Sequence, residues 1–322
     1  MSKPKVAFYW CASCGGCEES IVDLAEDILG VVAAVDIVLW PVAMDFKRHH
    51  VEAMPDGSIT ATLLNGAIRT SEQEEMARLL RRKTQVLIAY GACAQSGGIP
   101  ALANQFSREQ ILKYVYEDSP STVNPEKTRP QTRFEEEGRV AELPEFRNVV
   151  RSLDQVVDVD YYLPGCPPTP KVLKGALEAL LSGKLPPKGT ILSPDTATCM
   201  DCPRLDSKPQ DLAIEQFRRP HLTAMDPEKC FLAQGVPCMG SGTRGGCEAQ
   251  CPKGNMPCTG CFGPTSKVHD QGAKLLSALT STLAAKDEAG INQALKGIPD
   301  PVGTFYRYGL AKSLLRRKVD LQ

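Results

Sequence analysis

Hydrophobic and polar positions follow an alternating plan along the first 190 residues of the chain. Short apolar runs predict strands, and each is followed by a stretch whose apolar residues recur every three or four positions, as in amphipathic helices. Strands that alternate with helices form a parallel sheet with right-handed crossovers, so the predicted fold class is α/β. We expect strands at 5–10, 35–42, 85–90 and 156–163, and helices at 18–29, 72–82 and 171–181.

Two stretches interrupt this plan. Residues 118–147 are polar and proline-bearing and show no periodicity, which predicts an insertion or long loop on the sheet domain. Residues 186–194 are rich in proline and glycine, and we place the boundary between a domain 1–190 and a domain 191–322 there. The second domain has little periodicity before a helix expected at 272–285. We therefore expect metal sites, more than an apolar core, to hold it together.

Composition narrows the class of protein. The 322 residues are 42% hydrophobic, which is enough for a packed core, and the net charge of -1 gives no reason to expect nucleic acid or an anionic membrane as a partner. The chain shows no apolar run of the ~20 residues that span a bilayer and no secretion signal, so we expect a cytoplasmic protein. Disulfides are rare in a reducing compartment, so the 13 cysteines indicate metal binding or redox chemistry.

Four cysteines follow the ends of predicted strands. Cys14 and Cys17 come after the first strand, Cys93 after the third and Cys166 after the fourth. Ligands of an open parallel sheet bind outside the carboxyl ends of its strands, so three distant loops are expected to meet at one metal site. Cys11 lies three residues before Cys14 and offers an alternative ligand in the same loop.

The second domain supplies eight cysteines, enough for two further sites of four thiolates. Both zinc and cubane iron-sulfur clusters accept such ligands, and the prolines beside the cysteines favour iron-sulfur clusters over zinc. By local order the cysteines form two groups, although Cys238 and Cys247 could exchange between them. The groups are Cys199, Cys202, Cys230 and Cys238, and Cys247, Cys251, Cys258 and Cys261.

Three segments resemble those that ligate the proximal cluster in small subunits of nickel-iron hydrogenases, and the resemblance covers most of the chain. It implies a flavodoxin-like first domain whose proximal 4Fe-4S cluster is held by Cys14, Cys17, Cys93 and Cys166. It also implies that the nickel-iron site lies in a separate large subunit, so that this chain has no catalytic residue. The segments are Cys14-Gly15-Gly16-Cys17-Glu18-Glu19-Ser20, Gly91-Ala92-Cys93-Ala94 with Gly97-Gly98-Ile99-Pro100, and Pro164-Gly165-Cys166-Pro167-Pro168.

The second half resembles the cluster domain of the same family. The group from Cys199 to Cys238 resembles the distal-cluster segment, and the group from Cys247 to Cys261 the medial one. Membrane-associated relatives have a histidine and a proline at the places that Cys199 and Cys251 take here, so the resemblance implies 4Fe-4S clusters at both sites. The chain shows no twin-arginine signal, as in the cytoplasmic hydrogenases of this family. Its stretches 8–10 and 153–168 resemble those of the F420-non-reducing type, also known as methyl-viologen-reducing.

The function implied by this resemblance is electron transfer. Electrons from hydrogen oxidation at the large subunit would pass through three 4Fe-4S clusters to an iron-sulfur or flavin acceptor module, heterodisulfide reductase in the F420-non-reducing type, a system associated with electron bifurcation. Three alternatives stay open: the small subunit of an F420-reducing or NADP-linked hydrogenase, the cluster subunit of a quinone reductase, and a zinc-binding interaction module that is not an enzyme. Neither a nucleic acid nor a membrane is expected as a partner.

Other polar residues carry weaker predictions. Glu19 matches an acidic position near the subunit contact in the family, which makes it a candidate for a proton or interface role; the alternative is a carboxylate that stabilises the N-terminus of a helix. The basic stretch 303–322 is either a solvated helical end or a docking tail for a partner subunit. The four histidines are expected not to be ligands: His49, His50, His221 and His269.

Overall fold

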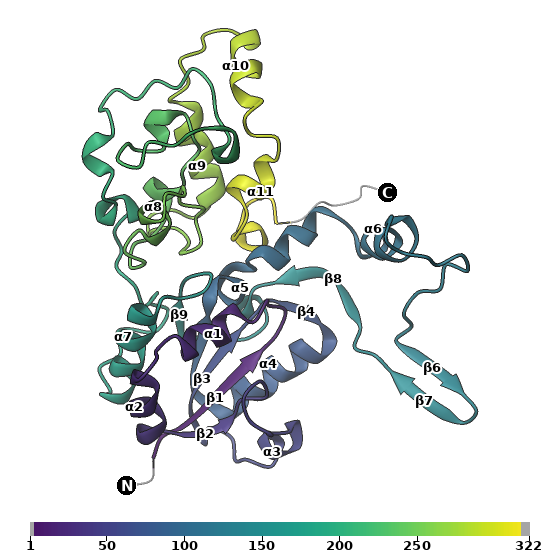
Figure 1. Cartoon of the computed structure of the whole chain (residues 1–322). Helices are drawn as coiled ribbons and strands as arrows, with labels where there is room; N and C mark the ends of the chain where they lie inside the picture. The colour runs from purple at the N-terminus through teal and green to yellow at the C-terminus, as the bar shows by residue number, and fades with distance from the viewer. Residues whose placement is uncertain (1–2, 317–322) are drawn as a thin grey trace.

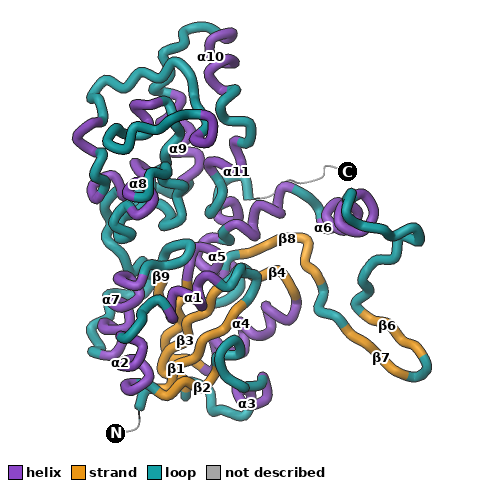
Figure 2. The backbone as a smooth tube through the Cα atoms, in the orientation of Figure 1, coloured by secondary structure: helices purple, strands orange, loops and turns teal. Residues whose placement is uncertain are grey.

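Five parallel strands form the central sheet of the first domain (Figure 1). The structure is a computed structural model that describes residues 3–316. Figure 2 shows the strands lying side by side. Their hydrogen bonds give the order β2-β1-β3-β5-β9, which is the order of a flavodoxin-like doubly wound sheet. The predicted α/β class is confirmed. The strands are β1 Lys5–Trp10, β2 Asp36–Leu39, β3 Ile59–Asn65, β5 Thr84–Tyr90 and β9 Tyr161–Leu163.

Helices cover both faces of this sheet. Successive side chains of a strand point to opposite faces, so Val6 and Phe8 pack on one side and Ala7 on the other. The first face packs against α1 Gly16–Val22, α2 Asp27–Ala34 and α7 Pro170–Leu181, and the second against α3 Arg48–Glu52 and α4 Ser71–Lys83.

Three details of the sheet domain differ from the prediction. The helix expected at 18–29 is two helices, α1 and α2, because the chain turns at Ala25, which has a positive φ of 50°. The strand expected at 156–163 is shorter, because pairing with β5 begins only at Tyr161. Strand β3 was not predicted, although it lies at the centre of the sheet.

An arm projects from the sheet domain and comprises residues 107–145 (Figure 1). It replaces most of the long loop predicted at 118–147. Strand β8 brings the chain back from the arm and pairs with β4 in an antiparallel ladder. The elements of this region are η1 Ile99–Gln105, α6 Arg108–Lys113, the π-helical η2 Tyr114–Asp118, the hairpin β6 Arg133–Glu136 and β7 Arg139–Glu142, then β8 Phe146–Arg151 and β4 Ile68–Thr70.

Beyond α7, the described chain consists of turns and short helices, as expected for a region of low regular structure. Hydrogen bonding to the sheet continues past residue 190, because Ile191 bridges to Tyr162 of β9; the domain boundary stays a prediction. The helices are α8 Gln250–Lys253, α9 Gln271–Thr280, α10 Glu288–Leu295 and α11 Pro301–Phe305, and the single turns are η4 Thr198–Asp201, η5 Leu205–Ser207, η6 Pro220–Leu222, η7 Leu232–Gln234, η8 Gly240–Gly242 and η9 Leu310–Lys312.

An apolar core joins this region to the sheet domain. Phe217, Phe231 and Leu275 are buried in one cluster that also contains Cys93 and Ala101 of the first domain. The C-terminal region thus has an apolar core beside its cysteine groups, and the expectation that metal sites stabilise it more than this core does stays a prediction. The core residues come from turns and from short helices, so they are irregularly spaced and leave no periodic pattern in the sequence.

The chain returns to the sheet domain near its end. The carbonyl oxygen of Tyr308 accepts hydrogen bonds from Ser96 Oγ at 2.7 Å and from the backbone N–H of Gly98 at 3.2 Å. Gln155 Nε2 donates to the carbonyl oxygen of Ala311 at 2.9 Å. The segment 308–311 therefore supports the loop that follows β5.

No helix between residues 3 and 316 combines the length and the apolar character that crossing a membrane requires. The end of the basic stretch predicted as a helical end or docking tail, residues 317–322, lies outside the described residues.

Candidate metal centres

Three loops at the carboxyl ends of β1, β5 and β9 bring four cysteines together. Cys14 and Cys17 flank the start of α1, Cys93 lies in α5 (Gly91–Ser96), and Cys166 follows β9. Burial raises the pKa of Cys17, and the nearby thiols of Cys93, Cys166 and Cys14 raise it further. Burial also raises the pKa of Cys93, to about 12, with a further contribution from Cys166 and Cys14. The four cysteines predicted to share a site are therefore neighbours, and a cation between them would stabilise their thiolate forms.

Two glycines shape this first site. Gly91 and Gly98 have φ of 83° and 56°. A Cβ at Gly91 would collide with the sulfur of Cys17, and a Cβ at Gly98 would lie 2.5 Å from the sulfur of Cys93. Only glycine lets the backbone approach the sulfurs so closely, where its N–H groups can stabilise a negatively charged cluster. The four thiols and their glycine cradle fit an iron-sulfur cluster.

A second group of four cysteines surrounds a small cavity in the C-terminal region. Burial raises the pKa of Cys199 to about 11, the thiols of Cys238, Cys202 and Cys230 raise it further, and Lys208 lowers it. A lysine at this wall favours negative charge in the cavity. The cavity is lined by Cys199, Cys202, Cys230 and Cys238 together with Arg204, Leu205, Lys208, Phe231, Leu232, Ser241 and Pro252.

The third group lies between the other two. Cys247, Cys251, Cys258 and Cys261 line a cavity whose wall also contains Cys166 of the first group. Burial raises the pKa of Cys261 to about 12, and a hydrogen bond from the backbone of Cys166 lowers it. The same partition into groups follows from the local order of the cysteines, and which sulfur would ligate which cluster stays a prediction.

Two contacts connect the three groups in series. The first is the cavity that Cys166 and Cys261 line together, where the nearby backbone of Cys166 lowers the pKa of the Cys261 thiol. The second joins the backbone N–H of Cys258 to the sulfur of Cys238, at 3.3 Å. The group of Cys247–Cys261 is therefore the middle member of a row of three.

A zinc site and an iron-sulfur cluster differ in size. Thiolates bound to one zinc ion lie about 2.3 Å from it, whereas a cubane cluster fills a larger space between its thiolates. The four thiols of the second group and the four of the third each line a cavity, an arrangement that suits a cluster.

Cys11 lies apart from the first group. It is buried among Leu39, Leu64 and Ala94, in the core on the opposite face of the sheet from Cys17. Burial raises its pKa, and Glu72 raises it further, whereas none of the four clustered thiols contributes. The geometry thus groups Cys14, not Cys11, with the other cysteines of the first site.

The acidic residues after Cys17 have contrasting surroundings. Glu19, the candidate for a proton or interface role, is exposed. Glu18 is buried, and its carboxylate accepts hydrogen bonds from Trp40 Nε1 and, at 2.6 Å, from Asn65 Nδ2. Burial raises the pKa of Glu18, while these two hydrogen bonds lower it. Sequence reasoning missed Glu18, although it lies three residues before Ile21 and so on the buried face of the helix.

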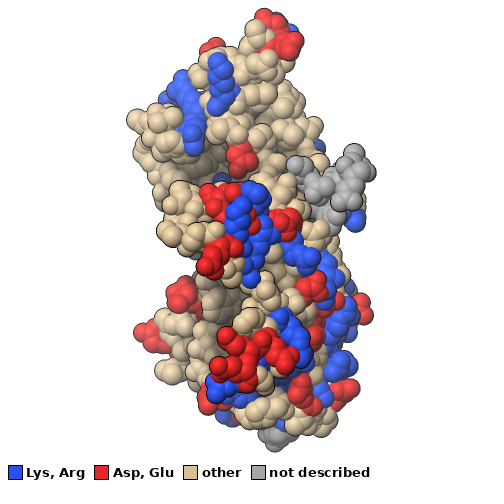
Figure 3. All heavy atoms as spheres, turned by 90° about the vertical axis from the view of Figure 1, so that its right-hand side faces the viewer, with Lys and Arg blue, Asp and Glu red and all other residues tan. Residues whose placement is uncertain are grey.

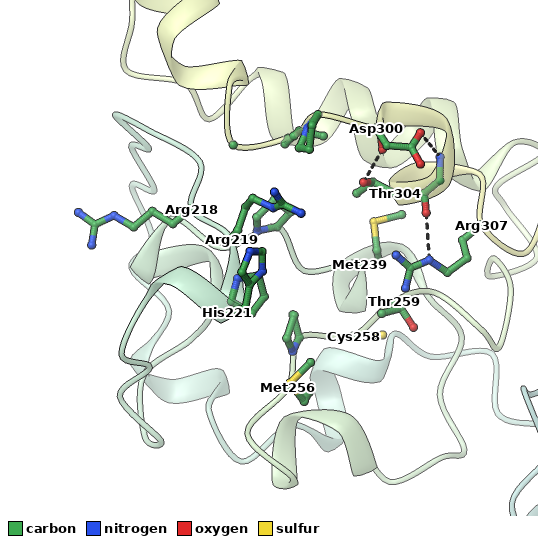
Figure 4. A pocket seen from close by; sticks show the side chains of 17 residues that line it. Arg218, Arg219, His221, Met239, Met256, Cys258, Thr259, Asp300, Thr304 and Arg307 are labelled. Atoms are coloured by element: carbon green, nitrogen blue, oxygen red, sulfur yellow. Dashed lines mark hydrogen bonds between the residues drawn. The ribbon is translucent and has the colours of Figure 1, made fainter. Parts of the chain in front are cut away.

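A basic pocket of about 390 Å³ lies beside Cys258 (Figure 4). Arg219 and His221 come from one wall and Arg307 from the opposite wall, while Arg218 points away from the pocket. The pocket places positive charge next to the middle group of cysteines. The other three histidines, His49, His50 and His269, are exposed.

Comparisons with known proteins agree with this arrangement. The family described as NADH ubiquinone oxidoreductase, 20 kDa subunit, matches residues 14–180. A [NiFeSe] hydrogenase from Dm. baculatum has a similar fold, with a TM-score of 0.51 at 19% identity, over 83% of this chain and 96% of that one. Fold and cysteine groups together define the class: an α/β subunit with three groups of cysteines that suit iron-sulfur clusters.

Relatives along the whole chain specify the family. The iron-sulfur subunit of the F420-non-reducing hydrogenase of Archaeoglobus profundus is 38% identical over 98% of both chains. A subunit of the vhu F420-non-reducing hydrogenase of Methanocaldococcus jannaschii is 36% identical over 98% of this chain and 97% of the relative. The chain belongs to this family of F420-non-reducing nickel-iron hydrogenase small subunits. Such subunits carry iron-sulfur clusters and pair with a large subunit that holds the catalytic site.

Proposed function

We propose that this chain carries three 4Fe-4S clusters and transfers electrons between the hydrogenase large subunit and an iron-sulfur or flavin acceptor module that serves heterodisulfide reductase. When bound, the clusters accept and release one electron at a time. The proposed ligands are Cys14, Cys17, Cys93 and Cys166 for the proximal cluster, Cys247, Cys251, Cys258 and Cys261 for the medial cluster, and Cys199, Cys202, Cys230 and Cys238 for the distal cluster.

The observation that carries this proposal is the row of three cysteine groups. Each group contains four thiols, and the contacts Cys166–Cys261 and Cys258–Cys238 connect neighbouring groups. Cys14 is exposed at one end of the row, where a partner subunit can cover it. A row with an accessible end is the arrangement that electron transfer between two partners requires.

Metal analysis of the anaerobically purified small subunit, separated from its partners, tests the cofactor assignment. Three 4Fe-4S clusters predict about twelve iron atoms and about twelve sulfides per small subunit. Stoichiometric zinc with little sulfide would favour the binding-module alternative. A stoichiometric three-iron signal in the oxidised protein would contradict the assignment of Cys199 or Cys251 as a ligand.

The basic pocket supports the proposal that the acceptor module docks there through an acidic surface. Opposite charges steer the association of two proteins and fix their relative orientation. Arg219→Glu reverses one charge of the pocket, and Arg218→Glu makes the same change on a neighbouring side chain that points away. We expect Arg219→Glu to slow electron delivery to the acceptor about tenfold at low salt, and Arg218→Glu to have less effect. Equal effects of the two variants would exclude the pocket as the docking site.

Co-purification identifies the acceptor. Mass spectrometry of the intact anaerobic complex is expected to find heterodisulfide reductase subunits. A flavin-bearing F420-reducing subunit or an NADP reductase subunit in their place would assign the chain to another branch and leave the cluster assignment intact.

A further inference from the structure

Arg69 is a buried cation without a hydrogen-bond partner among the described residues. It lies on β4, is 5% exposed and stacks on Phe146, with the guanidinium carbon 3.9 Å from the ring centroid. Its Nε, Nη1 and Nη2 atoms are all buried, and none has a hydrogen-bond partner within residues 3–316. Burial lowers the pKa of Arg69 to about 10, so the side chain stays charged at neutral pH. A buried charge without a partner is expensive, and proteins rarely keep one.

Arg204 is a second buried arginine that stacks on an aromatic ring, and its hydrogen bonds differ from those of Arg69. It is 2% exposed and also stacks on a phenylalanine, Phe231, at 4.2 Å. Its donors are nevertheless satisfied: they reach the carbonyl oxygens of Pro252, Asp226 and Lys229 and, at 2.8 Å, Asn255 Oδ1. Stacking on an aromatic ring thus accompanies hydrogen bonding in Arg204 and replaces it in Arg69.

A third buried arginine follows the same rule. Arg244 is 2% exposed, and its guanidinium lies 2.7 Å from the carboxylate of Asp195 and 2.9 Å from Ser266 Oγ. Arg69 is the exception among these three side chains. The missing group is therefore an acceptor that matches a guanidinium, and a carboxylate matches it best.

The surroundings of Arg69 hold more positive than negative charge. Arg108 is the charged neighbour that shifts its pKa, and it does so downward, as a cation. Figure 3 views the side toward which the arm projects and shows basic and acidic side chains intermingled over the sheet domain. At the root of the arm, four further arginines share two carboxylates: Glu74 pairs with Arg78, Arg147 and Arg151, and Glu145 pairs with Arg108 and Arg147.

Arg69 also lies close to the surface expected to face the large subunit. Ala67, two residues before it, forms a backbone bridge with Ala12, two residues before the exposed Cys14. Phe146 covers one face of the Arg69 guanidinium, and the charged neighbour Arg108 pairs with Glu145 at 3.2 Å, with both side chains of this pair about half exposed. An exposed ion pair contributes little stability, so the Arg108 side chain can turn away from Glu145 at low cost, while the backbone of Glu145 stays hydrogen-bonded to Ser71.

We propose that an acidic side chain of the hydrogenase large subunit enters at the arm root and pairs with Arg69 in the assembled enzyme. The pair supplies the missing carboxylate at a place continuous with the cluster-bearing surface. It also gives the arm root a role, since the Arg108 side chain would turn aside to admit the partner's carboxylate.

The test compares Arg69→Met with Arg204→Met, two equal changes of buried, ring-stacked arginines. Affinity for the large subunit is measured by titrating the tagged partner, and stability by thermal unfolding of the full small subunit. We expect Arg69→Met to weaken the complex on the order of thirtyfold or more, as loss of one partner of a buried charge pair does, and to leave the unfolding temperature unchanged or higher. Arg204→Met should lower the unfolding temperature, because it leaves four carbonyl or amide acceptors unpaired.

Three results would overturn the proposal. One is an unchanged affinity of Arg69→Met for the large subunit, and another is an unfolding temperature that falls as far as in Arg204→Met. The third is stabilisation of the wild-type chain, and not of Arg69→Met, by acetate or phosphate with no change in affinity, which would assign Arg69 to a free anion. If the isolated subunit does not stay folded, urea-induced dissociation of the co-expressed complexes provides the comparison. Iron content of both variants is measured in parallel, so that a failure of cluster assembly is distinguished from a failure of pairing.

Discussion

The two halves of the molecule place cysteines in different ways. In the sheet domain, five strands hydrogen-bonded to one another fix three loops, and the cysteines occupy the ends of a scaffold that is complete without them. In the C-terminal region, turns such as η4 and η8 carry or adjoin the cysteines, and single backbone hydrogen bonds, such as that from Met239 N–H to the carbonyl oxygen of Cys258 at 2.8 Å, connect them. We therefore expect the first half to present a preformed site and the second to depend more strongly on its metal sites.

The two halves are not independent, because they share one apolar core. Phe217, Phe231 and Leu275 bury the C-terminal region against the first domain. Removal of metal is therefore expected to loosen the loops around the cysteines before it separates the two halves.

The largest expected effect comes from metal removal. Chelation of the anaerobic protein should raise hydrogen exchange in residues 230–261 by about a hundredfold or more, because metal binding free energy is folding free energy there. Exchange in 84–90, the central strand β5, should change much less. Equal loss of protection in both peptides would show that the sheet depends on its metal as strongly as the C-terminal region does.

Next in size is the loss of one proposed ligand of the sheet domain. Cys14→Ala should remove the proximal cluster and so about four iron atoms per chain, since three thiolates remain. Cys11→Ala, three residues earlier, should keep all the iron and cost about 1 kcal/mol of stability through a small cavity. Iron and sulfide analysis checks both, and iron loss in Cys11→Ala with full iron in Cys14→Ala would reverse the choice between them.

A smaller effect is expected from the glycine beside Cys17. Gly91 and Gly189 have nearly the same φ, 83° and 86°, but a Cβ at Gly189 would meet nothing within 4 Å. Gly189→Ala should cost about 1–2 kcal/mol from its backbone conformation. Gly91→Ala should cost about 1–3 kcal/mol more from overpacking against Cys17 and alter the spectrum of the proximal cluster. Chemical denaturation measures the stability loss of both variants. Equal losses would contradict the close approach of Gly91 to the sulfur of Cys17.

The smallest expected effect concerns a carboxylate far from any cysteine group. Burial raises the pKa of Asp160, but hydrogen bonds from Arg81, Lys188 and the backbone N–H of Leu87 outweigh it and leave the pKa below its usual range. A lowered pKa in the folded state gives stability that is present above about pH 4 and is lost as the pH falls through the folded-state value. Asp160→Asn should remove about 1–3 kcal/mol at pH 7 and flatten this acid dependence. Unfolding measured between about pH 2 and pH 7 provides the check, and an unchanged slope would show that Asp160 is not responsible.

The sequence predicts the loops that carry cysteines better than it predicts the strands and hairpins. The cysteine groups could be inferred because each follows a strand end or lies in a stretch rich in cysteine. The spacing of nearby cysteines can be read from the sequence without knowledge of the tertiary structure. Strand β3 was missed because Thr60 and Thr62 interrupt its apolar residues, although threonine is a good strand former and Thr62 is buried. The hairpin of the arm was missed because Glu137 and Gly138 both adopt positive φ, and glutamate is an unusual residue for such a turn.

Other features depend on tertiary structure and have no local signal. The buried state of Glu18 depends on Trp40 and Asn65, which belong to other elements. The isolation of Arg69 within the described residues is a property of what surrounds it, since the same residue type at position 204 is fully bonded. Packing between segments that are distant in the sequence determines both the burial of Glu18 and the surroundings of Arg69. Such packing cannot be read from a single sequence.

The hydrogen bonds from Ser96, Gly98 and Gln155 to segment 308–311 have a consequence for biosynthesis. The loop that carries Cys93 is made early, but Tyr308, whose carbonyl oxygen supports it, is translated 212 residues after Ser96. A nascent chain therefore exposes Cys14, Cys17 and Cys93 without their final support. Cluster insertion into the first site is expected to follow synthesis of segment 308–311, so the maturation machinery must recognise a chain that already contains this segment.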